Sequence, residues 1–321
     1  MKAATGCKQT VNYEEKLSEI AAENKDVVVM TAENRAAIRS LPPILGDRFV
    51  DVGIAEQTLV GAAAGLALRG RIPIAHGIAA FLVLRAFEFI RTDAAMADLP
   101  VKLVGWQPGF LSEANGPTHQ AIEDVALIRT IPGMEIFCPA DQAEMVEVIA
   151  DVIKRPAPCY IRYNSSEPAV RHSTGLDYGR AELLSEGSDV SILVYGFLLR
   201  EAVKAAEILE RRGISVRLLN MRTLAPLDAE AILECASRTG LLVTIEDHFL
   251  KGGLYTCVAE VLLQGRVLCE VLPIALGGRW FRPALLDDVI SYEGFSGAQL
   301  ASRISRCLEQ NSMSRPVAPM A

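Results

Sequence analysis

The sequence has few aromatic residues, no concentrated charge of either sign and no long apolar run. Only 6% of its 321 residues are Phe, Trp or Tyr, and its formal net charge is −7. No basic run is interleaved with aromatic residues, which argues against nucleic acid as a partner. The uncharged apolar stretch at residues 72–84 is shorter than the roughly 20 residues that a membrane-spanning helix needs, so we expect no membrane span.

Paired cysteine motifs and the common catalytic signatures are also absent. The seven cysteines are scattered without a CxxC pair, which favours reduced thiols over disulfides or a zinc site. The first ten residues, MKAATGCKQT, lack the apolar core of a signal peptide, and we therefore expect a cytoplasmic protein. The sequence has no GxGxxG, P-loop, GxSxG or HExxH motif, so it gives no support to the enzyme classes that these motifs mark.

Hydrophobic residues are abundant, at 50% of the chain, and the mean hydropathy is +0.25. This composition predicts a large core or a large subunit interface, and the length suggests about two domains. Short apolar runs such as Val27–Met30, Val101–Val104 and Val190–Tyr195 alternate with segments of helical spacing. Alternation of this kind predicts an α/β fold with a parallel sheet covered by helices on both faces.

The alternating pattern is interrupted once, between residues 166 and 186, where Pro168, Gly175 and many polar residues occur. We interpret this segment as a linker. It divides a first α/β domain at residues 1–165 from a smaller second α/β domain at residues 187–310. Residues 311–321 are predicted to form a flexible tail.

Glu56 stands out because its neighbours are apolar. It belongs to the segment DVGIAEQ and precedes the apolar run at residues 59–68, with no basic residue close in sequence. Burial among apolar groups favours the protonated form of a carboxyl, which could then act as an acid or share a proton. The alternative is an exposed acid in the first turn of a helix. A helix that starts at Glu56 after a strand would place it at the ligand-binding edge of a parallel sheet.

Two further residues suggest a site. His119 lies on a loop with Gly116 and Pro117, where an imidazole suits proton transfer or substrate binding, unless it only neighbours a helix N-cap. Arg162 ends a predicted strand and could hold an anionic ligand, unless it forms an ordinary salt bridge.

Several segments together resemble the transketolase family. FVDVGIAEQTLVGAAAGLAL, RAFEFIR, NGPTHQAIEDVALIRTIPGMEIFCPAD and YIRYN resemble the pyrimidine-binding domain of transketolases and of 1-deoxyxylulose-phosphate synthase. NMRTLAPLD and VTIEDHFLKGGL resemble the transketolase C-terminal domain, so that the likeness covers residues 12 to 308. The resemblance implies a thiamine-diphosphate-dependent transferase that moves a two-carbon ketol unit from a ketose-type donor to an aldehyde.

The resemblance also implies residue roles. Glu56 would hydrogen-bond N1′ of the cofactor's aminopyrimidine and activate the cofactor. The residues expected on the cofactor are Glu56, Phe81, Ile54, Ile78 and Arg85. His119 would assist proton transfers at the sugar. The residues expected on the substrate are Asn115, Gln107, Arg162 and His119, with Arg162 holding a phosphate or carboxylate.

Some positions depart from the family pattern. Ile78 stands where a stacking phenylalanine is usual, and Gly77 replaces a threonine. Asn115 and Gln107 replace an aspartate and a histidine at the donor site, and residues 31–36 show no evident phosphate-side serine. Because a site built to pair particular hydroxyls discriminates strongly, these exchanges predict a non-standard donor or acceptor.

The chain lacks the half of a transketolase that holds the metal and the diphosphate. The Gly46-Asp47 pair is followed by Arg48 and lies in the wrong domain for the family's GDG motif. The resemblance therefore implies the C-terminal subunit of a split transketolase. Its partner would be an N-terminal subunit that holds Mg²⁺ and the diphosphate, in an α2β2 heterotetramer.

Two other hypotheses remain open at this point. One is the β subunit of a 2-oxoacid dehydrogenase or of an acyloin-forming enzyme, although the glutamate motif of those subunits differs from GIAEQ. The other is a catalytically silent partner subunit, which the altered stacking loop at Gly77 and Ile78 would favour and which the presence of Glu56 and His119 argues against.

Overall fold

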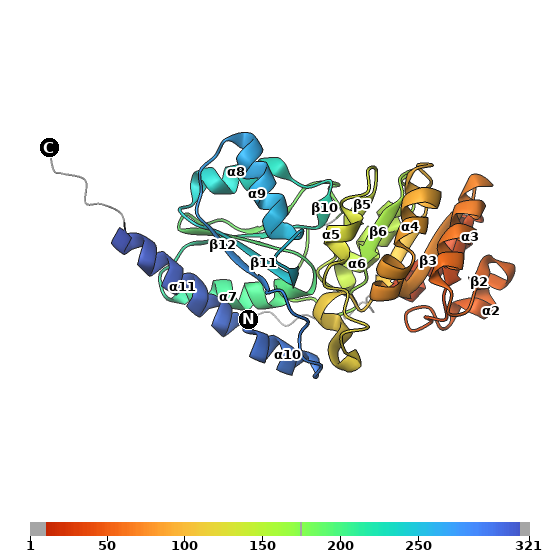
Figure 1. Ribbon diagram of the computed structural model, residues 1–321, viewed down its shortest axis with the longest axis horizontal. Coiled ribbons are helices and arrows are strands. Elements are labelled where there is room, and N and C mark those ends of the chain that lie inside the picture. Colours follow the sequence, from red (N-terminus) through yellow and green to blue (C-terminus); the bar gives the residue numbers. More distant parts are fainter. Residues whose placement is uncertain (1–10, 174, 315–321) are drawn as a thin grey trace, which may run out of the picture.

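The structure, a computed structural model, describes residues 11–173 and 175–314, except for the side chains of 311–314. It contains two predominantly parallel sheets flanked by helices, which confirms the predicted α/β class (Figure 1). The first sheet has the order β10 (Thr223–Ala225), β5 (Glu135–Phe137), β6 (Cys159–Arg162), β4 (Lys102–Trp106), β3 (Ile72–Ile78), β1 (Val27–Thr31), β2 (Phe49–Asp51). The second sheet has the order β12 (Val271–Leu276), β11 (Leu242–Phe249), β8 (Val190–Val194), β9 (Val216–Asn220), β7 (Glu182–Ser185).

Helices cover both sheets. Around the first sheet lie α1 (Tyr13–Glu23), α2 (Leu41–Leu45), α3 (Glu56–Leu68), α4 (Phe87–Phe89), α5 (Asp124–Ile128) and α6 (Gln142–Val152). The first domain also has the short 3₁₀ or π segments η1 (Gly46–Arg48), η2 (Phe81–Arg85), η3 (Ile90–Ala95) and η4 (Gly109–Asn115). The second domain has η5 (Gly196–Leu198), α7 (Leu199–Arg211), α8 (Ala229–Arg238), α9 (Leu254–Gly265), α10 (Leu286–Glu293) and α11 (Gly297–Ser314). Among the described residues, no helix is both long and apolar enough to cross a membrane.

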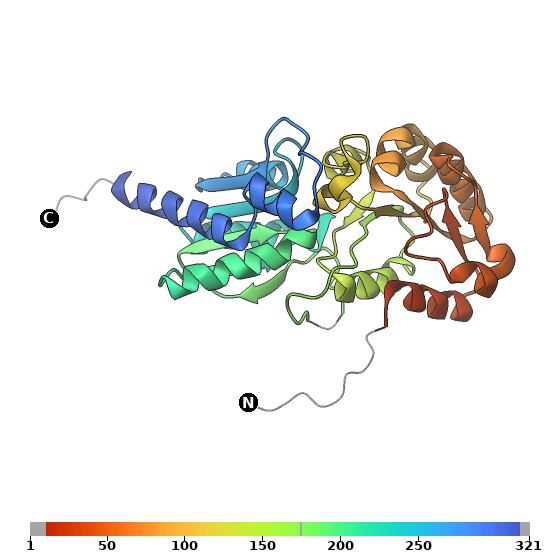
Figure 2. The same cartoon turned by 90° about the horizontal axis from the view of Figure 1, so that it is seen from below.

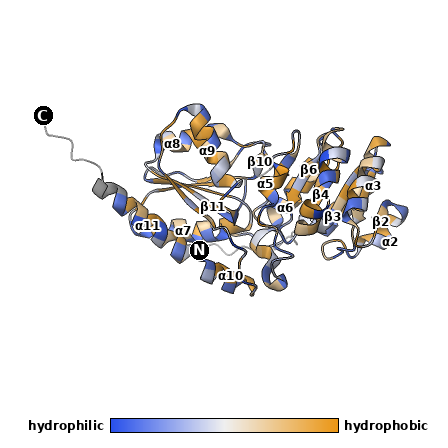
Figure 3. Cartoon of the chain, viewed as in Figure 1, coloured by the Kyte–Doolittle hydropathy of each residue, from blue (hydrophilic) through white to orange (hydrophobic). Residues whose placement is uncertain are grey.

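The sequence accounts for much of this local structure. All five residues of β1 are buried, as expected for a central parallel strand whose two faces are both covered. Helix α1 begins with a capping box, in which Asn12 and Glu15 each accept the other's backbone N–H. Figure 3 shows hydrophilic and hydrophobic residues alternating along α7 and α11, as in helices that bury one face; α7 packs on β9, and α11 packs on α7.

The parallel strands place the candidate residues at one edge. Glu56 begins the helix that follows β2, and Phe81 follows β3. Gln107 follows β4, and Arg162 ends β6. The carboxyl ends of parallel strands share an edge, which is where ligands bind in open α/β sheets.

The two domains are interlocked. Strand β10 belongs by sequence to the second half of the chain, yet it pairs antiparallel with β5 at the border of the first sheet. Conversely, Phe110 and Ile122 of the first half are fully buried in the core of the second domain. Figure 2 shows both sheets and the loops between them from below.

Two predicted boundaries need correction. The linker ends before residue 186, because Glu182–Ser185 forms the antiparallel edge strand β7 on β9. Helix α11 runs to Ser314, so residues 311–314 of the predicted tail are helical, and residues 315–321 lie outside the described residues. Helix α5 starts only at Asp124, beyond the loop that carries His119, and the backbone carbonyl of Ala121 before it accepts the N–H of Gly109 at 2.9 Å.

Candidate active site

Glu56 is the first residue of α3, and its side chain is only 3% exposed. The turn before it is fixed by Asp51, whose carboxylate accepts the N–H of Gly53 at 3.0 Å and the Nε–H of Arg35 at 2.8 Å. Gly53 has a φ of +73°, which favours glycine. This turn holds the Glu56 carboxylate at the carboxyl edge of the sheet, as predicted, and the exposed alternative is wrong.

Folding gives Glu56 a basic partner that the sequence does not reveal. The Nη1 of Arg85, 29 residues further along the chain, donates to Glu56 Oε2 at 2.6 Å. Arg85 is itself 42% exposed, so the buried Glu56 carboxylate pairs with a guanidinium that solvent or a ligand can reach. Two of the residues predicted on the cofactor are therefore in direct contact.

A continuous line of side chains extends from this pair. The guanidinium carbon of Arg85 lies 4.5 Å from the centre of the Phe81 ring, in cation–π range. The Phe81 ring in turn meets the ring of His119 edge-on, with 4.9 Å between centroids. Segment η2 is a single π turn that places Phe81 and Arg85 side by side. Glu56, Arg85, Phe81 and His119 thus form one group, which we call the Glu56 cluster.

The loop after β4 brings the predicted donor-site amides together. Asn115 donates its Nδ2–H to Oε1 of Gln107 at 3.0 Å. Thr118 Oγ1 lies 2.9 Å from Nδ1 of His119 and so orients the imidazole. The segment from Gln107 to His119, which we call the substrate loop, therefore presents two neutral amides and one imidazole.

The two isoleucines differ in exposure. Ile54 is 71% exposed in the turn just before Glu56. Ile78 ends β3 and is half-buried. An exposed isoleucine next to a buried carboxylate offers apolar contact to a flat ring or to another subunit.

Arg162 does not join these residues. Its Nε–H donates to Asp124 at 2.9 Å and its Nη1–H to Asp247 at 2.8 Å, and its side chain is only 3% exposed. The two carboxylates raise its pKa although burial alone would lower it. We therefore assign Arg162 to the contact between the domains rather than to substrate, which is the salt-bridge alternative that the sequence left open.

A cavity of about 700 Å³ lies beside the substrate loop, between the domains. Gln107 and the aromatic residues Trp106 and Tyr163 line it from the first domain. Phe197 and Arg200 line it from the second domain. No motif in the sequence predicts this cavity, because its walls come from separate segments spread between Trp106 and Leu286.

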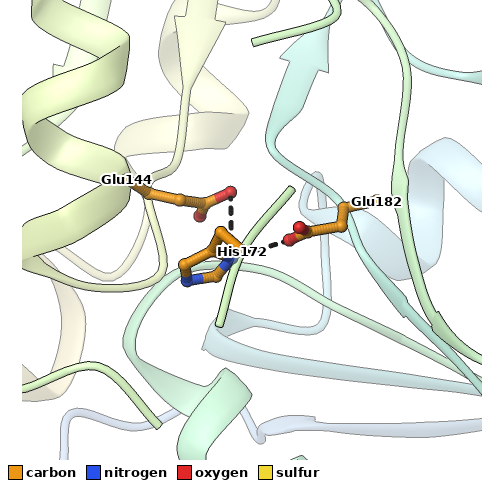
Figure 4. A group of neighbouring side chains, drawn as sticks. All are labelled: Glu144, His172 and Glu182. Atoms are coloured by element: carbon orange, nitrogen blue, oxygen red, sulfur yellow. Dashed lines mark hydrogen bonds and ion pairs between the residues drawn. The ribbon is translucent and has the colours of Figure 1, made fainter. Parts of the chain in front are cut away.

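Another group of titratable residues lies where the linker meets both domains. His172 lies with its Nδ1 2.7 Å from Glu182 and 3.7 Å from Glu144 (Figure 4). Its Nε2 lies 2.7 Å from Asp141. These carboxylates raise the pKa of His172 to about 10, so that it is an imidazolium at neutral pH. Arg222 pairs with Glu144 and, at 2.8 Å, with Glu182.

This arrangement argues against a metal ion at the Glu144, His172 and Glu182 group, although their ligand atoms lie within 4.8 Å of one another. Both ring nitrogens of His172 face carboxylates, and the carboxylates already have cationic partners. A metal ligand must instead offer a free lone pair. We interpret this group, the His172 cluster, as an ionic contact that ties the linker to both domains.

Comparisons with known proteins agree with this architecture. The sequence model of the family described as transketolase, pyrimidine binding domain, matches residues 9–169. The model described as transketolase, C-terminal domain, matches residues 179–283.

Two individual relatives are named as transketolase subunits. The chain is 39% identical to the 6-deoxy-6-sulfo-D-fructose transketolase subunit SqwH of Clostridium sp. (strain MSTE9), over 78% of this chain and 79% of that one. It is 33% identical to an apulose-4-phosphate transketolase subunit of Phocaeicola vulgatus, over 82% of this chain and 86% of that one. A solved structure titled split gene transketolase, inactive beta4 tetramer, matches with a TM-score of 0.82 and 33% identity, over 92% of this chain and 96% of that one. Since both domain models match in chain order and together cover most of its length, the chain belongs to the transketolase family.

Proposed function

We propose that this chain is the C-terminal subunit of a split, thiamine-diphosphate-dependent transketolase, in which the Glu56 cluster holds the aminopyrimidine of the cofactor. The observation that carries the proposal is the buried carboxylate of Glu56 at the carboxyl edge of the sheet, near the exposed side chain of Ile54 and the aromatic ring of Phe81. A flat, polar heterocycle needs such a combination of a ring contact and a hydrogen-bonding carboxyl. When bound, the cofactor supplies the electron sink that lets the donor's C2–C3 bond break.

The residues of this chain would divide the remaining work. Glu56 hydrogen-bonds the aminopyrimidine and holds or releases a proton at its carboxyl. Arg85 keeps that carboxyl in place, and Phe81 packs on the ring. His119, oriented by Thr118, moves protons at the hydroxyl groups of the sugar.

We assign Mg²⁺ and the diphosphate to a partner subunit. In the described ranges 11–173 and 175–314, the one candidate group of metal ligands is the His172 cluster, whose groups already pair with one another. An N-terminal subunit would therefore complete the site, in an α2β2 heterotetramer. The relatives named as transketolase subunits, and a neighbour whose title describes a beta tetramer as inactive, support this division. The free cysteines of the described residues suit a cytoplasmic location.

The substrate loop supports a non-standard donor or acceptor. Gln107 and Asn115 are neutral and hydrogen-bond each other, so they offer the donor neither a charge nor a basic group. Two relatives are named for 6-deoxy-6-sulfo-D-fructose and for apulose 4-phosphate, which are not the usual pentose phosphates of central metabolism. We propose that this enzyme likewise acts on a modified sugar or ketone.

The test is ketol transfer by the chain co-purified with a candidate N-terminal subunit, using hydroxypyruvate as donor and glycolaldehyde as acceptor. Loss of a proton-sharing group typically lowers a rate by about 10²- to 10⁴-fold. We expect a loss of that size in kcat for Glu56→Gln. Full activity of the Glu56→Gln complex would instead make this chain a silent partner, the hypothesis that the altered Gly77 and Ile78 favour. Activity with pyruvate and an artificial electron acceptor would favour a 2-oxoacid dehydrogenase.

A further inference from the structure

The substrate loop is anchored in the second domain on the N-terminal side of Asn115. The ring of Phe110 is fully buried, and its centroid lies 5.3 Å from that of Phe281 and 5.0 Å from that of Phe295. The backbone N–H of Phe110 donates to Oδ2 of Asp247 at 3.1 Å. This side of the loop therefore rests on side chains that the second domain supplies, and Figure 1 shows the η4 segment beside α10.

A second anchor lies immediately after His119. Gln120 is buried, and its Nε2–H donates to the backbone carbonyl of Phe281 at 2.8 Å. Two residues later the carbonyl of Ile122 accepts the N–H of Phe249 from β11 at 2.8 Å. The residues between the two anchors include Asn115 and His119, so the second domain brackets the segment that we assign to the donor.

Asp247 also links this loop to the buried ion pairs between the domains. Its Oδ1 accepts from Arg162 at 2.8 Å, and Arg162 reaches Asp124 at the start of α5. Gly109 completes the contact, since a Cβ there would lie 1.9 Å from Oδ2 of Asp247. The backbone of the loop approaches this carboxylate so closely that only glycine fits.

The cofactor side of the site is built differently. The contacts that join Glu56, Arg85 and Phe81 all come from α3 and η2 of the first domain. His119 is the one member of the Glu56 cluster that the substrate loop supplies. A change at Asp247 or Gln120 should therefore disturb the loop, including His119, and leave the contacts among Glu56, Arg85 and Phe81 in place.

We propose that Asp247 and Gln120 are positioning residues, through which the second domain fixes Asn115 and His119 against the donor; the catalytic part of this inference rests on the proposed function. The two residues touch neither donor nor cofactor. They set the position of the loop that does.

Hydrogen exchange of the whole chain tests the structural part without any assay of activity. We expect Asp247→Asn and Gln120→Leu to raise amide exchange in residues 109–122 at least tenfold, with α3 unchanged. Asp228→Asn is the matched control, because Asp228 is another buried aspartate of the second domain and caps α8 instead. Unchanged exchange in 109–122, or an equal rise throughout both domains, would overturn the inference.

Kinetics of the complex with the N-terminal subunit test the catalytic part. With hydroxypyruvate and glycolaldehyde, we expect Gln120→Leu and Gly109→Ala to lower kcat/KM at least tenfold while the Kd of thiamine diphosphate changes less than twofold. Gly213→Ala is the control, since Gly213 has a similar positive φ but no neighbour for a Cβ within 4 Å.

Equal losses of cofactor affinity and of turnover would contradict a role confined to the loop. If the unmodified complex shows no ketol transfer at all, the proposed function fails, whereas hydrogen exchange still decides whether the second domain holds the loop.

Discussion

Arg85 and Arg162 both pair with buried carboxylates at the same edge of one sheet, yet their surroundings give them different roles. Arg85 is 42% exposed and holds one carboxylate, that of Glu56. Arg162 is 3% exposed and holds two, those of Asp124 and Asp247. A guanidinium that is open on one side can adjust when a ligand arrives. Arg162, enclosed by two carboxylates, instead stabilises the contact between the domains. Burial and the number of ionic partners therefore distinguish the structural role of Arg162 from the ligand-binding role proposed for Arg85.

Replacement of Arg162 should have the largest effect on stability. Arg162→Met leaves Asp124 and Asp247 buried without their cation, and breaking a buried pair costs about 3–5 kcal/mol. We expect the midpoint of thermal unfolding to fall by roughly 10 °C. A melting curve of the variant beside that of Arg85→Met checks this, and equal midpoints would abolish the distinction between the two arginines.

The His172 cluster should make stability depend on pH. Its carboxylates raise the pKa of folded His172 to about 10 from 6.5, so its contribution is complete below pH 6.5 and is lost as pH rises towards 10. Hydrogen bonds to Glu182 lower the pKa of its folded carboxyl to about 2, although burial opposes this shift. The contribution of Glu182 to stability is therefore complete above pH 4.5 and is lost as pH falls towards 2.

Urea unfolding of the wild type and of His172→Gln at pH 6 and pH 10 measures this contribution. We expect the wild type to be more stable at pH 6 and the difference to shrink by pH 10. A difference that grows with pH would mean that His172 is neutral in the folded protein.

Arg85 should matter more for the cofactor than for folding. Because Arg85→Met leaves one buried carboxylate without its cation where Arg162→Met leaves two, we expect Arg85→Met to cost less stability than Arg162→Met. Loss of the charged hydrogen bond and of the contact with Phe81 should raise the Kd of thiamine diphosphate about tenfold in the complex. Arg85→Lys should restore part of the affinity, and an unchanged Kd in both variants would remove Arg85 from the site.

The smallest effect is expected at Arg71, whose pair with Asp26 has both side chains about half exposed. Arg71→Gln should change stability by no more than about 0.5 kcal/mol. A loss comparable to that of Arg162→Met would show that exposure does not control the strength of these pairs.

Local sequence patterns were sufficient for much of the fold and for part of the site. The strand β1 follows from its apolar, β-branched run and the helix that begins at Glu56 from its alanine and leucine content, and the edge position of Glu56 follows from the order of strand and helix. The pairing of Glu56 with Arg85 does not, because it depends on how η2 packs on α3. Sequence reasoning therefore located the carboxylate, and the family resemblance placed Arg85 on the same cofactor, but neither predicted the direct pairing of the two.

The substrate loop shows a second limit of sequence reasoning. The sequence identified Asn115 and His119, but nothing in it indicates that Asp247, more than 120 residues later, would hold the loop. Likewise, nothing in the sequence indicates that β10, from the second half of the chain, pairs with β5 of the first sheet. Both features depend on contacts between the domains, which hydrophobic periodicity and secondary-structure propensity do not predict.

The proposed function depends most on the claim that this chain supplies only the pyrimidine half of a shared cofactor site. Calorimetric titration of thiamine diphosphate with Mg²⁺ tests this claim directly, on the chain alone and on its complex with a candidate N-terminal subunit. We predict tight binding in the complex and none by the chain alone, and a weaker affinity in the Arg85→Met complex. Tight, Mg²⁺-dependent binding by the isolated chain would contradict the claim and would require a diphosphate site within these 321 residues.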